Sequence, residues 1–323
     1  MRGVKWSVLV GLWLFTSLLA GCGGQSAEPA IVTTPLQIDM IIKQKDSEYW
    51  NTVKLGAEVA AKEFNVKLNF RGPDRETDIE GQIKLMEASI QAGPDAIILA
   101  AGDYMALAKI TDQAIGIPVI TMDAEVASAR PVAFIGANNY ASGQLAAERL
   151  STLTGPEAEI GIVNFVKGAR NADQRLEGLL DYLARYPGIS IMETAYCGAD
   201  QELAYRQAAA MLEKHPGLDA IVALSGEGGL GVGRAVREAG LVPKVKIVTF
   251  DSPPAVMEML QEGTVQATVI QNPFSNGYLA VKQAVEYIQG LEVPDRTDTG
   301  TKLIDLNNMM WPENQKQLFP FVR

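Results

Sequence analysis

The chain has 323 residues, of which 47% are hydrophobic, and it carries a formal net charge of −10 with a single histidine, His215. This length allows two domains with cores of their own, and such an acidic surface repels nucleic acid, so we expect no DNA or RNA partner. One histidine argues against histidine-based metal sites and against a Ser/His/Asp triad built elsewhere, and we expect neither a metal nor a cofactor.

The first predicted element is a secretory signal peptide over residues 1–22. Val8–Ala20 is an apolar run behind a positively charged start, and it is too short for a comfortable membrane span. Its end, Leu-Ala-Gly-Cys22, resembles the lipobox of bacterial lipoproteins. We therefore predict lipidation at Cys22 and a position on the extracytoplasmic face of the cell membrane; the alternative is an ordinary signal peptide cleaved near Gly24. Residues 23–35, rich in small residues, are predicted to be a flexible tether.

From residue 36 onward, short β-branched runs alternate with amphipathic stretches of helical period. The predicted strands are 37–42, 66–70, 96–100, 119–122, 132–135, 160–165, 190–195, 220–224, 246–250, 267–271 and 302–306. The predicted helices are 50–64, 79–92, 140–153, 174–185, 201–214, 230–239 and 278–289. This alternation predicts an α/β fold with parallel sheets covered by helices.

The two halves of this pattern repeat one another. Pro94–Leu99 is matched by Leu218–Leu224, and the run that ends in Asp123 is matched by the run that ends in Asp251. The repeat predicts two similar doubly wound lobes with a cleft between them. Because ligands bind beyond the carboxyl ends of such strands, we expect the two carboxylates to face the cleft from opposite walls. The alternative for each aspartate is a cap on the turn or helix that follows.

Four segments of the sequence resemble the type I periplasmic sugar-binding proteins, the ribose-binding-protein-like group of solute-binding lipoproteins that serve ABC importers. The segments are Ser47–Trp50 leading into Lys54–Ala57, Ile117–Asp123, Arg175–Gly178 and Val248–Pro253. The resemblance runs from about Leu36 to Leu306. It implies two lobes joined by three hinge crossings, the N-terminal lobe from 36–137 plus 272–300 and the C-terminal lobe from 138–271 plus 301–323.

The resemblance also implies a set of ligand-binding residues and no catalytic ones. Tyr49 and Trp50 match an aromatic pair that packs on the faces of a sugar ring. Asp123, Asp251 and Gln271 match positions that form hydrogen bonds with ring hydroxyls. The full predicted set also includes polar candidates at the cleft: Ser47, Asp173 and Ser225.

Two departures from the ribose-type pattern bear on the ligand. Ala124 and Asp173 stand where that pattern has arginines, which makes the predicted pocket more negative. We expect a monosaccharide or a related sugar derivative, with an amino sugar, a protonated polyol derivative or a sugar held with the help of Arg170 as alternatives to plain ribose. Arg175 is expected to tie its helix to the lobe.

Four functional interpretations remain open at this point. The protein is expected to be a monomer that delivers its ligand to an ABC permease, or a sensor that presents its closed form to a membrane receptor or histidine kinase. A glycosidase would have to use carboxylates such as Asp123, Asp173, Asp251 and Glu227. Gly226–Gly231 fits the dinucleotide pattern G-x-G-x-x-G, for which the alternative is a glycine-rich helix entry at the cleft.

Overall fold

The computed structural model describes residues 34–318. The predicted signal peptide, Cys22 and all but the last two residues of the predicted tether lie outside the described residues. Within the described part, no helix combines the length and the apolar character that a membrane span needs.

Within residues 34–318, the first sheet has six strands in the order β2-β1-β3-β4-β5-β11, and every neighbouring pair is parallel. The strands are β1 (Leu36–Ile41), β2 (Val66–Arg71), β3 (Ala96–Leu99), β4 (Val119–Met122), β5 (Pro131–Gly136) and β11 (Arg296–Asp298). Strands β3 and β4 are buried at every position. Helices cover both faces of a parallel sheet, which is why these strands are continuous apolar runs rather than alternating ones.

The second sheet of the described chain repeats this order as β7-β6-β8-β9-β10-β12. Its strands are β6 (Glu157–Asn164), β7 (Gly188–Tyr196), β8 (Ala220–Ala223), β9 (Lys246–Phe250), β10 (Ala267–Ile270) and β12 (Lys302–Ile304). The sheets differ at the last strand, since β12 runs antiparallel to β10 whereas β11 runs parallel to β5. The predicted α/β fold with two similar doubly wound lobes is confirmed.

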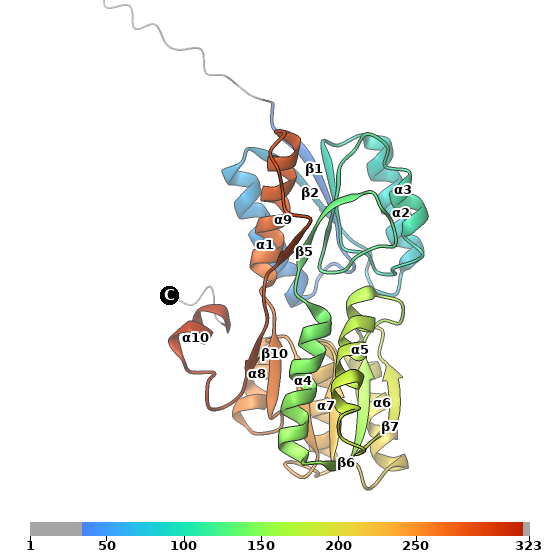
Figure 1. The fold of residues 1–323 in the computed structure, drawn as a ribbon, viewed down its shortest axis with the longest axis vertical. Coiled ribbons are helices and arrows are strands. Elements are labelled where there is room, and N and C mark those ends of the chain that lie inside the picture. Colours follow the sequence, from blue (N-terminus) through green and yellow to red (C-terminus); the bar gives the residue numbers. More distant parts are fainter. Residues whose placement is uncertain (1–33, 319–323) are drawn as a thin grey trace, which may run out of the picture. The chain divides into compact units, whose positions relative to one another are not determined.

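Helices complete two lobes (Figure 1). Each lobe has a hydrophobic core of its own. The first lobe contains the first sheet with α1 (Glu48–Glu63), α2 (Ile79–Ala92), α3 (Ala108–Asp112) and α9 (Pro273–Ile288). The second lobe contains the second sheet with α4 (Asn139–Thr154), α5 (Arg170–Leu183), α6 (Gln201–Lys214), α7 (Gly226–Glu238), α8 (Pro254–Gln261) and α10 (Pro312–Leu318).

Within the described residues, the chain passes from one lobe to the other three times. After β5 it enters α4, which packs on the second sheet, and after β10 it enters α9, which packs on the first sheet. The third passage is the short connection between β11 and β12. Each lobe therefore includes a helix that follows the fifth strand of the other lobe in chain order.

In two helix pairs, glycines allow the backbones of the two helices to approach each other closely. Gly56 and Gly277 meet where α1 packs on α9, and Gly143 and Gly178 meet where α4 packs on α5. A Cβ added to any of these four glycines would lie 2.0 Å from a backbone carbonyl oxygen of the facing helix. The close approach therefore depends on the absence of a side chain.

Several helices begin earlier than the sequence predicts. The structure starts α5 at Arg170, α7 at Gly226 and α9 at Pro273, whereas the predicted ranges start about four or five residues later. Helix α9 begins at Pro273, and a proline is well suited to the first position of a helix. Helix α7 begins with several glycines, whose low helix propensity is overridden by tertiary packing. The short elements α3, α8, α10 and β11 were not predicted, because each offers too few residues for a clear period.

We predict that Gly178→Ala destabilises the protein by about 1 to 3 kcal/mol, because the added methyl group forces α4 and α5 apart. At an uncrowded helical position the same change stabilises by up to about 1 kcal/mol, so the sign of the effect is the test. Urea denaturation followed by circular dichroism measures it. An increase in stability would show that the helices do not cross as closely as described.

Candidate functional site

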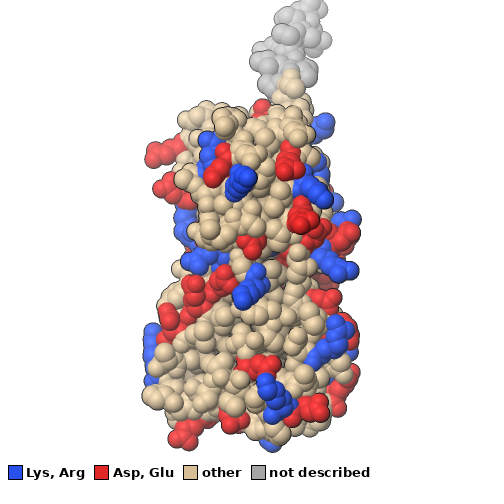
Figure 2. All heavy atoms as spheres, turned by 90° about the vertical axis from the view of Figure 1, so that its right-hand side faces the viewer, with Lys and Arg blue, Asp and Glu red and all other residues tan. Residues whose placement is uncertain are grey.

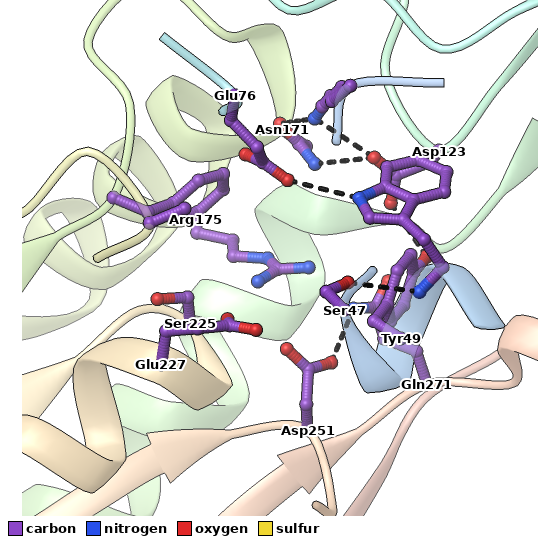
Figure 3. A pocket seen from close by; sticks show the side chains of 14 residues that line it. Ser47, Tyr49, Glu76, Asp123, Asn171, Arg175, Ser225, Glu227, Asp251 and Gln271 are labelled. Atoms are coloured by element: carbon purple, nitrogen blue, oxygen red, sulfur yellow. Dashed lines mark hydrogen bonds and ion pairs between the residues drawn. The ribbon is translucent and has the colours of Figure 1, made fainter. Parts of the chain in front are cut away.

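A cavity lies between the two lobes, at the carboxyl ends of the central strands (Figure 3). The space between its lining atoms is about 390 Å³, with the open solvent at its mouth included. The residues of the first lobe that line it are Lys43, Ser47, Tyr49, Trp50, Glu76 and Asp123. Those of the second lobe are Phe165, Asn171, Arg175, Ala199, Ser225, Glu227 and Asp251, and Gln271 lies in the connection between β10 and α9.

The two aspartates of the predicted pair occupy equivalent places in the two lobes. Asp123 follows β4 and Asp251 follows β9, and both have a left-handed backbone, with φ of 64° and 62°. Aspartate tolerates this conformation better than most residues. The amide of each donates a 2.9 Å hydrogen bond to the next strand, to Ile135 O and to Val269 O. Asp251 is not the N-cap of α8, because Pro253 holds that place, and the element that follows Asp123 is β5 and not a helix. Both side chains line the cavity.

Asp123 is fully paired within the cavity wall. Lys43 Nζ lies 2.9 Å from Oδ2, Tyr49 donates from its hydroxyl to Oδ1 at 2.7 Å, and Asn171 donates from Nδ2 to Oδ2 at 3.0 Å. Lys43 also donates to Asn171 Oδ1 at 2.9 Å. Lys43 is 1% exposed and Asp123 is 4% exposed, and a buried ion pair is tolerated when hydrogen bonds satisfy its remaining atoms. Because Asn171 belongs to α5, this network joins the two lobes.

The aromatic side chains of the cavity serve different purposes. Burial, and after it the charge of Asp123, raises the pKa of Tyr49 well above its ordinary value, so its phenol stays protonated and donates. The ring of Trp50 meets that of Tyr49 edge to face, with centroids 5.1 Å apart. Trp50 Nε1 donates to Glu76 Oε1 at 3.3 Å. Trp50 and Phe165 provide apolar surface from the first and the second lobe.

Arg175 holds the second lobe together and also lines the cavity. Its Nε donates to Asn139 Oδ1 at 2.9 Å and its Nη1 donates to Leu224 O at 2.7 Å, which ties α5 to the start of α4 and to the end of β8. The guanidinium stacks over Phe250, 4.4 Å from the ring centroid. In Figure 3 its remaining edge points into the middle of the cavity.

Asp251 and the two predicted serines are held by neutral donors. Asp251 accepts hydrogen bonds from Gln271 Nε2 at 2.8 Å and from the amide of Gly226 at 3.3 Å. Ser47 and Ser225 are the N-cap residues of α1 and α7, so their oxygens accept backbone N–H groups while their hydroxyl protons remain available. Both serines and Gln271 line the cavity.

Three carboxyl groups of the cavity have raised pKa values. Burial raises the pKa of Glu227 to about 7, and the neighbouring charges of Asp251 and Glu76 act in the same direction. Burial also raises the pKa of Glu76 and of Asp251. These carboxyl groups therefore retain protons to a higher pH than free carboxyl groups do.

Asp173 is the one predicted site residue that does not line the cavity. Asn171 and Arg175 are four residues apart on α5, so they share the face of the helix that lines the cavity. Asp173 lies two residues from each and therefore projects elsewhere. Arg170 also lies outside the lining, and it pairs with Glu177 at 3.2 Å.

Several lining residues were not among the predicted ligand contacts, and the internal repeat offers a signal for two of them. The amide of Ala100 donates to Ile41 O in the first sheet, and the amide of Leu224 donates to Val163 O in the second. Lys43 and Phe165 follow Ile41 and Val163 at the same distance, so they hold equivalent positions. Extending the repeat to the first strand of each half would have found both.

Packing accounts for two of the four glycines of Gly226–Gly231. A Cβ on Gly229 would lie 2.1 Å from Thr249 Oγ1, and a Cβ on Gly231 would lie 2.5 Å from Gln201 O. These glycines allow α7 to pack closely on β9 and on α6. Among the described residues, no three histidine, cysteine or acidic side chains form a group that could hold a metal ion.

Comparisons with known proteins agree with this architecture. The periplasmic binding protein domain family matches residues 38–292. The D-ribose/D-allose-binding protein of Pseudomonas aeruginosa is 30% identical over 274 residues, which cover 82% of this chain and 85% of that protein. Two solved structures have TM-scores of 0.86: a carbohydrate transporter solute-binding protein of Agrobacterium radiobacter with D-arabinose, and an ABC transporter solute-binding protein of Agrobacterium vitis with D-fucose. They are 29% and 28% identical and each covers 88% of this chain, which in turn covers 99% and 100% of them.

We predict that Glu227 lowers the stability of the unliganded protein as pH rises from about 4.5 through about 7. In that window the native carboxyl group keeps a proton that the unfolded chain has released, so stability falls with rising pH, by at most about 3 kcal/mol for this group. Glu227→Gln should therefore raise the thermal unfolding midpoint relative to the wild type at about pH 8 and leave it unchanged at about pH 4. An equal effect at both pH values would contradict the raised pKa.

Proposed function

Because this chain belongs to the periplasmic binding protein family, we propose that its interlobe cavity binds one monosaccharide, which the protein delivers to an ABC importer at the extracytoplasmic face of the cell membrane. The family is one of sugar-binding transport proteins and not of enzymes, so the carboxylates of the cavity are assigned to binding and not to hydrolysis.

The observation that carries this proposal is the lining of the cavity, which combines many hydrogen-bonding groups with apolar ring surface. A monosaccharide presents hydroxyl groups around its edge and C–H groups on its faces. Carboxylates accept strong hydrogen bonds from hydroxyls, and the free edge of Arg175 and the amide of Gln271 donate. Trp50 and Phe165 offer surface for the C–H faces.

The proposed ligand-binding residues are those of the predicted set that line the cavity: Ser47, Tyr49, Trp50, Asp123, Ser225, Asp251 and Gln271. Their roles differ. Asp251, Gln271 and the serine hydroxyls are assigned to direct hydrogen bonds with the sugar. Asp123 already accepts from Lys43, Tyr49 and Asn171, so it is assigned to fixing these donors at the cavity wall.

Binding is proposed to be coupled to closure of the lobes. The cavity takes its lining from both lobes, and the chain joins the lobes by three connections within the described residues. A sugar that touches both walls binds the closed arrangement more tightly than the open one, and this difference in affinity shifts the population toward closure.

The mature protein is proposed to be a monomer held at the membrane by a lipid on Cys22. The lipobox-like end of the predicted signal peptide supports the anchor. On the face of the described protein that Figure 2 shows, acidic and basic side chains are interspersed and no extended basic patch is present. This surface fits a protein that does not bind nucleic acid.

We predict that Trp50→Ala and Asp251→Asn each weaken binding at least tenfold, because one removes ring surface and the other a charged acceptor. A thermal-shift screen with D-ribose, D-allose, D-arabinose, D-fucose and D-galactose identifies the ligand, and isothermal titration calorimetry then gives the affinities. Asp173→Asn is the matched control: it removes an acidic charge of the same lobe outside the cavity, and binding should stay within about twofold. Normal binding by both cavity variants would refute the site.

We predict that the mature protein begins at a lipid-modified Cys22 and fractionates with membranes, whereas Cys22→Ser is released or retained as an uncleaved precursor. Mass spectrometry of the purified N-terminal peptide checks the modification. An unmodified cysteine, or a mature chain that begins near Gly24, would contradict the anchor and leave the sugar site unaffected.

A further inference from the structure

The acidic groups of the cavity outnumber its cations. The carboxylates are Glu76, Asp123, Glu227 and Asp251, and the cations are Lys43 and Arg175. Lys43 pairs with Asp123 and is fully engaged in that network. Within the described lining, neither cation forms an ion pair with the three further carboxylates, although the charges of Lys43 and Arg175 partly offset the burial that raises the pKa of Glu76, and the charge of Arg175 does so for Asp251.

Two of these carboxylates are incompletely paired. Glu76 Oε2 is buried and forms no hydrogen bond, although Oε1 accepts from Trp50. Among the described residues, Glu227 has no side-chain partner, and its carboxylate is held by its own backbone amide at the start of α7. In Figure 3 the carboxyl groups of Glu76, Glu227 and Asp251 point into one space around the free edge of Arg175. This arrangement leaves a buried acceptor, Glu76 Oε2, without a protein partner in the described chain, beside a cavity that can hold a ligand.

We propose that the bound monosaccharide carries a positive charge, as an amino sugar does, and that Glu76 and Glu227 receive its ammonium group. This inference rests on the proposed sugar-binding function and specifies the substrate class. An ammonium group has three N–H donors and no acceptor, so it can bond to two carboxylates and neutralise part of their charge at once. A hydroxyl donates a single hydrogen bond and leaves the excess negative charge buried.

The proton balance of the cavity supports the same conclusion. Burial raises the pKa of Glu227, and the groups that face it include Glu48 of α1, Glu76, Asp251 and the cation Arg175. Without a ligand the excess charge is reduced by bound protons. A cationic ligand takes the place of those protons, whereas a neutral sugar has to bind with the protons still in place.

The test is isothermal titration calorimetry of the mature protein with matched pairs of sugars, D-galactosamine with D-galactose and D-glucosamine with D-glucose, at about pH 7. The amino sugar of at least one pair should bind at least tenfold more tightly than its hydroxyl parent. Glu227→Gln and Glu76→Gln should each reduce this ratio at least fivefold. Glu258→Gln, an exposed residue of α8 in the same lobe, is the control and should leave the ratio unchanged.

A pH series adds a readout that a purely steric preference would not give. The affinity for the amino sugar should fall several-fold from about pH 7 to about pH 5.5, because the carboxylates must then give up protons on binding, and the affinity for the hydroxyl parent should change less. Parent sugars that bind as tightly as their amino partners in both pairs refute the charged-ligand inference and leave sugar binding intact. Failure of every sugar in the thermal-shift screen and in these pairs to bind refutes the proposed function and this inference together.

Discussion

The cavity depends on how buried negative charge is compensated. A carboxylate removed from water must find a cation, hydrogen-bond donors or a proton. Asp123 finds the first two, because Lys43 reaches it from the end of β1 and Asn171 reaches it from the other lobe. Among the described residues, Asp251 accepts hydrogen bonds from neutral donors only, and Arg175 acts on it by its charge without an ion pair. The two equivalent aspartates of the cleft are thus compensated differently. Asp123 is paired within the protein, whereas Asp251 can still accept hydrogen bonds from a ligand.

The two aspartates differ in their partners although the backbones of the two lobes are similar. Tyr49 and Asn171 each lie two residues after the N-caps of α1 and α5, and both donate to Asp123. The close helix crossings repeat in the same way, since Gly56 and Gly178 lie nine residues after those N-caps. Duplication therefore fixes where side chains enter the cavity. The identity of each side chain then decides whether a position completes the wall or contacts the ligand.

Much of this arrangement could be predicted from the sequence, and the failures have a physical pattern. The parallel sheets, the repeat and the places of Asp123 and Asp251 follow from apolar runs and from the rule that such strands present their carboxyl ends to ligands. Glu76 could not be found in this way, because it lies in the loop between β2 and α2, where no periodicity fixes a direction. Asp173 was predicted as a ligand contact from its position in the family's sequence pattern. Its position on α5, two residues from Asn171 and from Arg175, directs it away from the cavity.

The hydrogen-bond partners of the cavity carboxylates also indicate which contacts can make closure of the lobes depend on the ligand. Asn171 joins the lobes through Lys43 and Asp123 without any ligand, so this bridge contributes equally whether the cavity is empty or filled. A ligand shifts the equilibrium only by the difference in its affinity for the two arrangements. In the proposed site that difference comes from ligand contacts on both walls, among them Glu76 on the first lobe, whose Oε2 has no protein partner in the described chain, and Glu227 on the second. On this proposal, selection of the ligand and closure of the lobes depend in part on the same carboxylates.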